Sequence, residues 1–349
     1  MYSLFRPLLF KLDPERAHRL TLQLVRLAGV VPPARWALQA MFSAPGKPVE
    51  VFGLQFKNAV GLAAGYDKDG VAISGLATLG FGHLEIGTVT PRPQPGNPGP
   101  RVFRLVEDQA VINRMGFPSK GAEAAAGALR RVLKGRRLTG TSGAGSLPVI
   151  GVNLGKNKDT SLEEATNDYV ALMKTFSSLA DYLAINVSSP NTAGLRRLQG
   201  RDMLESLLGA LAEERSQNAP GRAGRLPILV KLAPDLSGGE LEDALDVILH
   251  TGMDGVIVTN TTLAREGLHS RYQGETGGLS GGPLLVRSEA ILALVLKMLD
   301  GRIPVVSVGG IMSPEDARRR LDRGAALVQI YTGLVYAGPG LVKKILRAV

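Results

Sequence analysis

The sequence contains no cysteine and only four histidines among its 349 residues. Without cysteine the chain has no disulfide, no thiolate ligand for zinc or an iron–sulfur cluster, and no thiol to act as a nucleophile or base. The histidines are scattered and lack metal-ligand spacing, so we expect no metal site. Aromatic residues make up only 5% of the chain and no nucleic-acid-binding motif accompanies them, so we expect no nucleic-acid partner.

Long uncharged apolar runs are also missing. No run reaches the roughly 18 residues that a membrane-spanning helix needs. The apolar residues of the first segment are interrupted by charges and by proline, and they lack the small-residue cleavage site of a signal peptide. We therefore expect neither a transmembrane helix nor a cleaved leader.

The composition is that of a folded protein with many tight loops. Hydrophobic residues make up 44% and charged residues 21%, with 43 glycines and 21 prolines. The formal net charge is +10 and the pI is about 9.9. Because no nucleic-acid signature is present, we assign this positive charge to anionic ligands and to an anionic membrane surface.

Residues 1–45 differ from the rest of the chain and are predicted to form a separate helical pair. Asp13 can cap a helix that starts at Pro14, and a second short helix is predicted over Pro33–Phe42. The apolar face of the first helix comprises Ala17, Leu20, Leu24 and Leu27. Such a pair can lie in the membrane interface with basic residues at the headgroups, or it can pack on the main domain. The sequence leaves both open.

Residues 46–349 alternate short apolar runs with amphipathic stretches. Three of these stretches have helix-start signals, beginning at Ser161, Ser237 and Ser313. The pattern predicts a parallel sheet closed into a (β/α)8 TIM barrel, with an open doubly wound sheet as the alternative. The predicted strands are Ala59–Ala64, Leu84–Gly87, Val149–Val152, Tyr182–Ile185, Ile228–Val230, Gly255–Val258, Val305–Val308 and Leu327–Ile330.

Polar residues follow the predicted strands, where a barrel carries its active site. After the fourth strand comes Asn186-Val-Ser-Ser-Pro-Asn-Thr192, which alone would suit an ordinary polar turn. Glycines such as Gly281, Gly309 and Gly310 could let the backbone approach a phosphate. The residues themselves thus predict a phosphate-bearing cofactor, and an anionic or amide-rich substrate read by asparagines and lysines.

Several motifs together resemble the class 2, quinone-dependent dihydroorotate dehydrogenases almost end to end. The carrying motifs are Asp13-Pro-Glu-Arg-Ala-His18, Gly61-Leu-Ala-Ala-Gly-Tyr-Asp-Lys68, Glu85-Ile-Gly-Thr-Val-Thr-Pro91, Ile112-Asn-Arg-Met-Gly-Phe117, Asn153-Leu-Gly-Lys-Asn157, Asn186-Val-Ser-Ser-Pro-Asn191, Thr259-Asn-Thr-Thr262, Gly277-Gly-Leu-Ser-Gly281, Val308-Gly-Gly-Ile311 and Val328-Gln-Ile-Tyr331. A family carrying these motifs oxidises dihydroorotate to orotate in the biosynthesis of UMP. It passes a hydride to one FMN per chain, and electrons then pass to a membrane quinone.

The resemblance implies roles for individual residues. Ser189 would be the general base, ranked above Ser188 by the motif, with Thr192 and a water near Phe117 as relay candidates. Neighbouring residues of an extended chain face opposite ways, so only one of the two serines should face the substrate. The implied FMN contacts are Ala64, Gly65, Thr88, Asn153, Asn186, Lys231, Thr259, Gly281, Gly310, Tyr331 and Thr332. The implied substrate contacts are Lys68, Asn113, Arg114, Met115, Gly116, Phe117, Asn186, Asn191, Asn260 and Thr261.

The subclass follows from serine at the base position, because the soluble subclasses use cysteine there. His18, Arg104 and Tyr331 match positions near the quinone. We accordingly expect a monomeric, peripheral enzyme on the cytoplasmic face of a bacterial inner membrane. The departures are few: Tyr66 stands where leucine or phenylalanine is commoner, and Thr332 where serine is usual.

Two other functions remain possible from the sequence. One is an FMN barrel that oxidises a different pyrimidine or a hydroxy acid, although hydroxy-acid oxidation would more naturally use a histidine base. The other is a membrane-associated barrel that has lost catalysis. Two polar segments, Gly135–Leu147 and Gln217–Arg225, are predicted to be surface connections away from the chemistry.

Overall fold

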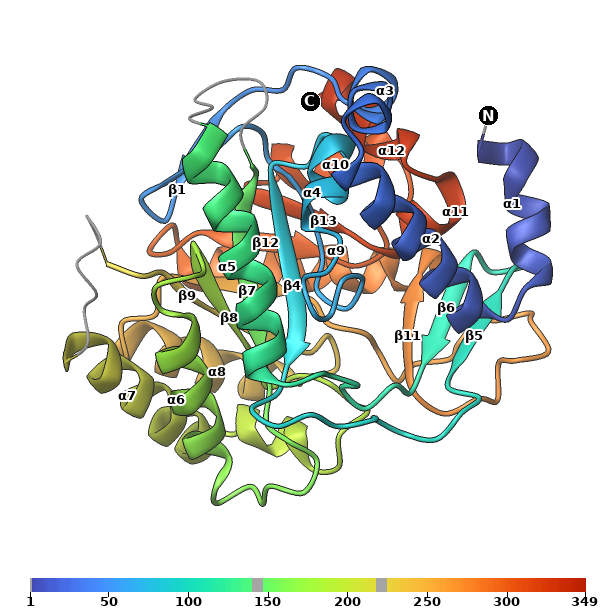
Figure 1. The fold of residues 1–349 in the computed structure, drawn as a ribbon. Coiled ribbons are helices and arrows are strands. Elements are labelled where there is room, and N and C mark those ends of the chain that lie inside the picture. The colour runs from blue at the N-terminus through green and yellow to red at the C-terminus, as the bar shows by residue number, and fades with distance from the viewer. Residues whose placement is uncertain (1, 140–146, 218–224) are drawn as a thin grey trace.

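The chain folds into a closed barrel of eight parallel strands, as the computed structural model shows (Figure 1). The structure describes residues 2–139, 147–217 and 225–349. Every neighbouring pair of barrel strands is parallel, which confirms the predicted barrel and excludes the open sheet. The strands are β3 (Val60–Leu62), β4 (His83–Val89), β7 (Val149–Leu154), β8 (Tyr182–Asn186), β9 (Ile228–Leu232), β10 (Gly255–Val258), β12 (Val305–Val308) and β13 (Leu327–Ile330).

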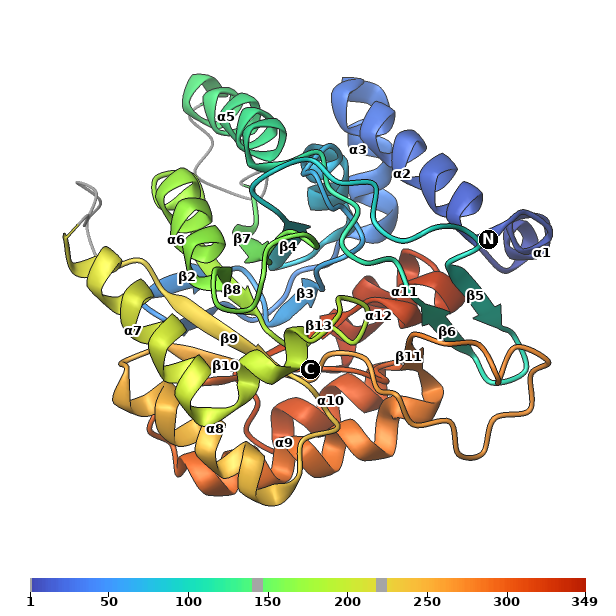
Figure 2. The same ribbon diagram turned by 90° about the horizontal axis from the view of Figure 1, so that it is seen from below.

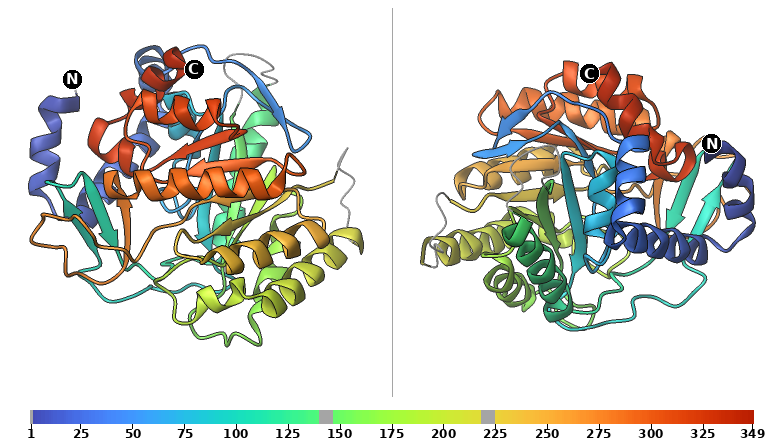
Figure 3. Two further views of the ribbon diagram at one scale, coloured as in Figure 1. Left: turned by 180° about the vertical axis from the view of Figure 1, so that it is seen from behind. Right: turned by 45° about the horizontal axis from the view of Figure 1, so that its top comes forward.

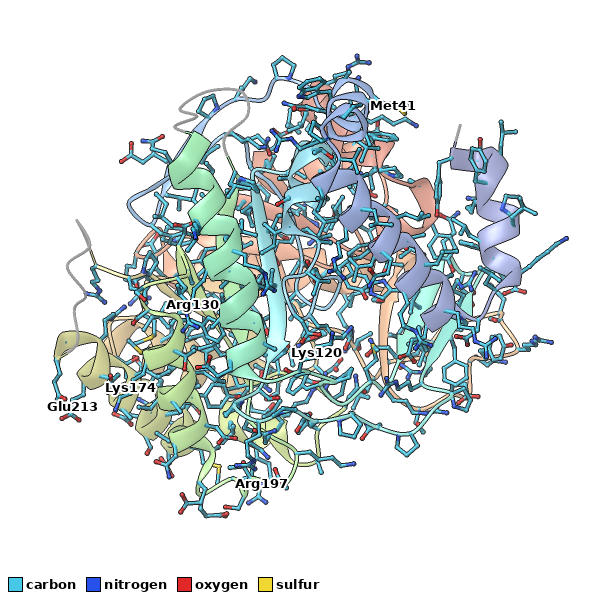
Figure 4. The ribbon with its side chains drawn as sticks, in the orientation of Figure 1. Met41, Lys120, Arg130, Lys174, Arg197 and Glu213 are labelled. Atoms are coloured by element: carbon cyan, nitrogen blue, oxygen red, sulfur yellow. The ribbon has the colours of Figure 1, made fainter. Side chains whose placement is uncertain are left out.

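Helices surround the strands, with the N-terminal helices gathered at one side of the ring (Figure 2). The ring consists of α4 (Ile73–Leu76), α5 (Ala122–Thr139), α6 (Ala165–Phe176), α7 (Arg201–Gln217), α8 (Gly238–His250), α9 (Leu285–Leu299), α10 (Pro314–Asp322), α11 (Thr332–Ala337) and α12 (Gly340–Ala348). Short 3-10 turns lie at Ala77–Leu79, Leu195–Gln199 and Gly282–Leu284. Charged side chains such as Arg130 on α5 and Lys174 on α6 lie on the outside of this ring (Figure 4).

The predicted helix starts are correct at two of the three serines. Ser237 and Ser313 each form a reciprocal capping box with the acidic residue three positions later. The prediction at Ser161 was wrong: its hydroxyl accepts a hydrogen bond from the Glu164 N–H, but the two residues form a turn and the helix starts at Ala165. A serine followed by glutamate fits a turn as well as a helix start.

The two predicted surface connections begin later than expected. Helix α5 continues to Thr139, so the first five residues of the Gly135–Leu147 segment are helical and were wrongly assigned to a loop. The remainder, residues 140–146, lies outside the described residues, and so do residues 218–224 of the second connection.

The barrel interior is filled by rings as well as by aliphatic side chains. Glycines on neighbouring strands make the room: a Cβ on Gly61 would lie 2.0 Å from the His83 ring, and one on Gly151 would lie 2.1 Å from the Tyr182 ring. Aliphatic residues such as Leu229 and Ile257 complete this inner layer. A separate and larger apolar layer packs the strands against the outer helices.

The excursion at Gln94–Lys120 forms a small antiparallel sheet that the sequence did not predict. Strand β5 (Val102–Leu105) pairs with β6 (Ala110–Asn113), and β6 pairs with β11 (Gly278–Gly281). The sheet extends the barrel at one side (Figure 1). It therefore places Asn113 opposite Gly278 and Ala110 opposite Gly281, although these residues are far apart in the sequence.

The N-terminal segment forms three helices, one more than predicted. The predicted pair is present as α2 (Pro14–Val30), capped by Asp13, and α3 (Pro32–Phe42). The additional helix is α1 (Tyr2–Lys11), which tolerates Pro7 near its middle. A short hairpin of β1 (Val49–Val51) and β2 (Leu54–Phe56) then leads into the barrel.

These helices both pack on the barrel and expose apolar side chains. Val25 and Leu22 pack against the barrel's apolar layer. On the other side Leu4 is 74% exposed and Trp36 is 64% exposed, and the helices form one projecting corner of the molecule (Figure 3). The segment therefore packs on the barrel, and its exposed apolar side chains keep the membrane-interface alternative open. No helix in the described residues is long and apolar enough to cross a bilayer.

Helix α2 packs closely against Gly75 of α4, and this contact can be tested by substitution. A Cβ on Gly75 would lie 2.0 Å from the Val25 carbonyl oxygen of α2. We expect Gly75→Ala to lower the free energy of unfolding by about 1–3 kcal/mol, measured by urea denaturation. Gly209→Ala on α7 is the matched control, because no atom of the described structure lies within 4 Å of a Cβ there. Equal stability of the two variants would contradict close helix–barrel packing.

Candidate active site

A cavity of about 450 Å³ opens at the carboxyl ends of the barrel strands. This volume suits a small-molecule site. Its walls come from the strand ends, from the loop after β8, from the β5–β6–β11 sheet and from the N-terminal helices. One space thus extends from Asn186 and Ser189 at the barrel mouth to Leu24 and Phe42 on the helices.

The floor of the cavity at β4, β7 and β8 is a chain of hydrogen bonds between amides and a hydroxyl. Thr88 Oγ1 donates to Asn153 Oδ1 over 2.6 Å, and Asn186 Nδ2 donates to both, over 2.9 and 3.0 Å. Each group restrains its neighbours, so Thr88 and Asn186 present a fixed polar surface to the cavity and Asn153 supports them from beneath.

The loop after β8 separates the two adjacent serines. Ser189 lines the cavity. Ser188 is fully buried, and its hydroxyl accepts a hydrogen bond from Asn260 Nδ2 over 2.9 Å. The Asn191 backbone N–H donates to Ser189 Oγ over 3.2 Å. Ser189 therefore faces the cavity, and the hydrogen bond of Ser188 with Asn260 holds the loop in place.

Arg196 fastens this loop to the neighbouring one. Its Nε donates to the Ser188 carbonyl over 3.1 Å and its Nη2 donates to the Thr261 carbonyl over 2.8 Å. Asp235 pairs with the same guanidinium at 2.8 Å. Sequence reasoning missed Arg196, because nothing in its local pattern shows that the fold places it between two loops.

Lys68 brings a half-buried cation to the cavity wall. Its Nζ donates to the Gly65 carbonyl over 2.7 Å. Burial is the largest influence and lowers the pKa of Lys68 to about 8, although the nearby Glu15 and Asp69 carboxylates oppose that shift. Lys68 therefore carries its positive charge at neutral pH, but its ammonium has few water molecules around it. A bound anion would provide the electrostatic stabilisation that this missing water would otherwise give.

The opposite wall is built from glycine-rich backbone. Gly310 has φ +72°, and a Cβ there would lie 2.3 Å from the Leu285 Cα. Gly281 has φ +101°, and beside it Thr332 Oγ1 donates to Ser280 Oγ over 2.9 Å. The close approach of these backbones leaves room for glycine alone at both positions.

Aromatic rings connect the barrel mouth with the N-terminal helices. His18 of α2 meets Tyr66 edge-on at 5.0 Å between ring centroids, and Tyr66 meets Tyr331 at 5.8 Å. Burial, followed by the charge of Lys68, lowers the pKa of His18 to about 4. His18 is therefore neutral at pH 7. Arg104 lies 4.6 Å from the Phe10 ring and donates to the Leu9 carbonyl over 3.3 Å.

The structure brings most of the predicted site residues together. Those that line the cavity are His18, Ala64, Gly65, Lys68, Thr88, Arg104, Asn113, Met115, Gly116, Phe117, Asn186, Ser189, Asn191, Lys231, Thr259, Asn260, Thr261, Gly281, Gly310, Tyr331 and Thr332. Two do not line it. Asn153 lies beneath the floor, and Arg114 turns away to pair with Glu275 at 2.6 Å and to stack on Phe103.

Comparison with known proteins gives a consistent result. The family model for dihydroorotate dehydrogenase matches residues 48–349. A protein of Halorhodospira halophila named dihydroorotate dehydrogenase (quinone) is 49% identical over 349 residues, covering 100% of this chain and 97% of the relative. A Pseudomonas putida protein of the same name is 47% identical, covering 100% and 98%.

Solved structures agree with the sequence comparison. The ligand-free dihydroorotate dehydrogenase of Eimeria tenella superposes with a TM-score of 0.87 at 40% identity, covering 96% of this chain and 94% of that one. The same enzyme in complex with ferulenol gives a TM-score of 0.85 at 39% identity, covering 96% and 90%. The resemblance seen in the sequence motifs is confirmed: this chain belongs to the dihydroorotate dehydrogenase family.

Proposed function

We propose that the protein oxidises dihydroorotate to orotate in pyrimidine biosynthesis, with FMN as its cofactor and a membrane quinone as its electron acceptor. The observation that carries the proposal is one continuous cavity. At the barrel mouth it combines Lys68, Ser189 and several asparagine amides, and at its other end it reaches the apolar residues of the N-terminal helices. Both bacterial relatives described above are named dihydroorotate dehydrogenase (quinone), which supports this proposal.

The polar lining fits FMN. Gln329 Oε1, one side-chain atom of the lining, is buried and has no hydrogen-bond partner among the described residues. It can accept a hydrogen bond from a ring N–H. Lys231, Thr259 and Asn186 would contact the ring and the ribityl chain, and the backbone at Gly281, Gly310 and Thr332 would hold the phosphate. When bound, FMN supplies the hydride acceptor that no side chain of the chain can provide.

The substrate would lie beside Ser189. Dihydroorotate is a carboxylate on a cyclic diamide, so Lys68 would bind its carboxylate, and Asn113, Asn191 and Asn260 would pair with its amide groups. Asn113 and Asn191 are already joined, because Asn191 Nδ2 donates to Asn113 Oδ1 over 3.1 Å. The asparagines are thus held in place before the ligand arrives.

Ser189 would act as the general base. Its Oγ takes the proton from C5 of dihydroorotate as hydride leaves C6, and the hydroxyl's own proton passes onward. A serine hydroxyl is a weak base, so it needs such a relay. Thr192 is suited to that role, because its Oγ1 is buried and lacks a partner within the described part of the chain.

The quinone would enter between the N-terminal helices. His18, Tyr331 and Arg104 lie along this end of the cavity, and neutral His18 can both donate and accept a hydrogen bond. Residues 1–45 would form the membrane-associating unit on the barrel of residues 46–349. We propose that the protein acts as a monomer on the cytoplasmic face of a bacterial inner membrane; its relatives in Halorhodospira halophila and Pseudomonas putida support a bacterial setting.

Membrane binding gives a second prediction. Leu4 and Leu8 on α1 are 74% and 61% exposed. Burying a leucine in lipid contributes roughly 1.5–3 kcal/mol, so Leu4→Ser combined with Leu8→Ser should weaken binding to anionic vesicles at least tenfold, measured by co-sedimentation. Val286→Ser on α9 is the control, since Val286 is 78% exposed on a helix of the barrel ring, outside the N-terminal segment. Equal losses in both proteins would contradict insertion through α1.

Steady-state turnover tests the proposed activity. The purified protein, given dihydroorotate and a short-chain ubiquinone, should form one orotate for each quinone reduced. Fumarate or NAD in place of the quinone should not support turnover. Turnover with fumarate, or none with any acceptor, would contradict the proposal.

A further inference from the structure

A buried carboxylate lies inside the barrel beneath the cavity. Glu85 of β4 is fully buried, at a level where barrels are usually filled by branched aliphatic side chains. Oε1 accepts from Asn153 Nδ2 over 2.9 Å and from Lys231 Nζ over 3.3 Å. Oε2 accepts from Gln329 Nε2 over 2.8 Å and from the Tyr182 hydroxyl over 3.1 Å. Side chains from four other strands thus converge on one carboxylate.

The surroundings keep Glu85 ionised in spite of its burial. Desolvation is the largest single influence and would raise its pKa. The charge of Lys231 and the hydrogen bonds from Gln329 and Asn153 together outweigh it, so the pKa of Glu85 is lowered. A buried ion pair is weak evidence for a stabilising role, because a neutral pair of the same shape is often as stable. The pair therefore calls for a function other than stability.

Two of the four donors also line the cavity. Lys231 and Gln329 lie between Glu85 and the space assigned to the cofactor, while Asn153 holds the Thr88 and Asn186 side chains of the floor. Glu85 therefore fixes the position of Lys231, which brings a positive charge to this part of the cavity. It also places a negative charge directly behind that cation.

We infer that Glu85 is a positioning residue that sets the reduction potential of the bound flavin by orienting Lys231 and offsetting its charge. The inference rests on the proposed function, because it requires FMN in the cavity. Lys231 favours the negative charge that reduction adds to the cofactor, and the carboxylate behind it opposes that charge. The opposition keeps the potential low enough for electrons to pass readily to the quinone.

The substitution Glu85→Gln tests the inference with little change of shape. The new amide oxygen can still accept from Asn153 and Lys231, and the new NH₂ group can donate to the Tyr182 hydroxyl, which lies 3.1 Å from that position in the wild type. With the cation uncompensated, the equilibrium constant for two-electron reduction of bound FMN should rise at least tenfold, about 30 mV. The measurement is anaerobic redox titration of the purified, FMN-loaded variant against a reference dye.

Tyr182→Phe is the matched control. It removes one neutral donor from the same carboxylate and leaves the charges unchanged, so the equilibrium constant should stay within about twofold of wild type. An FMN-loaded Glu85→Gln protein with the wild-type potential would overturn the inference and leave Glu85 a structural role alone. Failure of the proposed function would look different, as a wild-type protein that holds no FMN.

A second pair of variants keeps the test decisive if Glu85→Gln does not hold FMN. In the Lys231→Gln background the cation is gone, and adding Glu85→Gln should again raise the potential. Equal potentials for the single and double variants would overturn the inference, because the carboxylate charge would then have no effect on the cofactor.

Discussion

Replacing Ser189 by alanine is expected to slow dihydroorotate oxidation by about 10²–10⁴-fold while leaving FMN bound. This range is what a positioned general base contributes. Ser189 Oγ lines the cavity, and within the described ranges its one hydrogen bond is accepted from the Asn191 backbone N–H, so a second lone pair and its proton are both available. Stopped-flow reduction of the flavin by dihydroorotate, compared with the absorbance of the bound flavin before mixing, separates the two effects.

Ser188→Ala is the matched control for this substitution. This substitution also removes a serine hydroxyl, but the Ser188 hydroxyl forms hydrogen bonds with the Asn260 and Asn186 side chains and does not line the cavity. We expect flavin reduction to be slowed much less than in Ser189→Ala. Equal rates for the wild type and Ser189→Ala would remove Ser189 from the reaction.

Substituting Lys68 should have the second large effect, on substrate binding. Lys68→Gln shortens the side chain by one atom, keeps it polar and loses the ammonium that would pair with the substrate carboxylate. Loss of one partner of a buried charge pair costs about 2–5 kcal/mol, so the KM for dihydroorotate should rise by roughly 30- to 5,000-fold. The rise should be far smaller for the electron acceptor, whose KM provides the internal control.

The same lysine predicts the pH dependence of the reaction. The pKa of Lys68 is lowered to about 8, so the free protein loses the ammonium as pH rises through that value. A bound carboxylate favours the charged form and raises the pKa again. The affinity for dihydroorotate should therefore be highest and constant below pH 8. Above pH 8, kcat/KM should fall about tenfold per pH unit. A profile in which Lys68→Gln retains the same alkaline limb would assign that limb to another group.

The barrel could be predicted because its signals are local. Each strand is a short apolar run that ends at a polar residue, and Ser237 and Ser313 mark helix starts by contacts within four residues. The cavity lining could be predicted for a related reason. Once the strands are parallel, their carboxyl ends must meet at one mouth, which places Asn186, Lys231 and Thr259 together.

The features that sequence reasoning missed depend on contacts between distant residues. Strand β11 pairs with β6 across more than 160 residues, as in Leu279↔Ile112, and neither strand is strongly patterned by itself. Helix α1 contains Pro7, which argues against a helix locally, but Tyr2 at its start donates to the Val335 carbonyl of α11 over 2.5 Å. Tertiary contacts decided the structure in both cases.

The site shows the same division. Arg114 was predicted to contact the substrate because it lies inside a matching motif, but its guanidinium forms a salt bridge with Glu275. Glu85 is part of another matching motif, and no periodicity shows that its side chain receives donors from four strands. A motif locates a segment at the site, and the structure then decides which side chains face the ligand.

The most direct test of the proposed reaction is anaerobic mixing of the purified protein with dihydroorotate while the flavin absorbance is followed, and then addition of ubiquinone or fumarate. We predict a yellow protein that dihydroorotate bleaches, and that ubiquinone restores while fumarate does not. A yellow protein that dihydroorotate fails to bleach would contradict the assigned substrate, and restoration by fumarate would contradict the assigned acceptor.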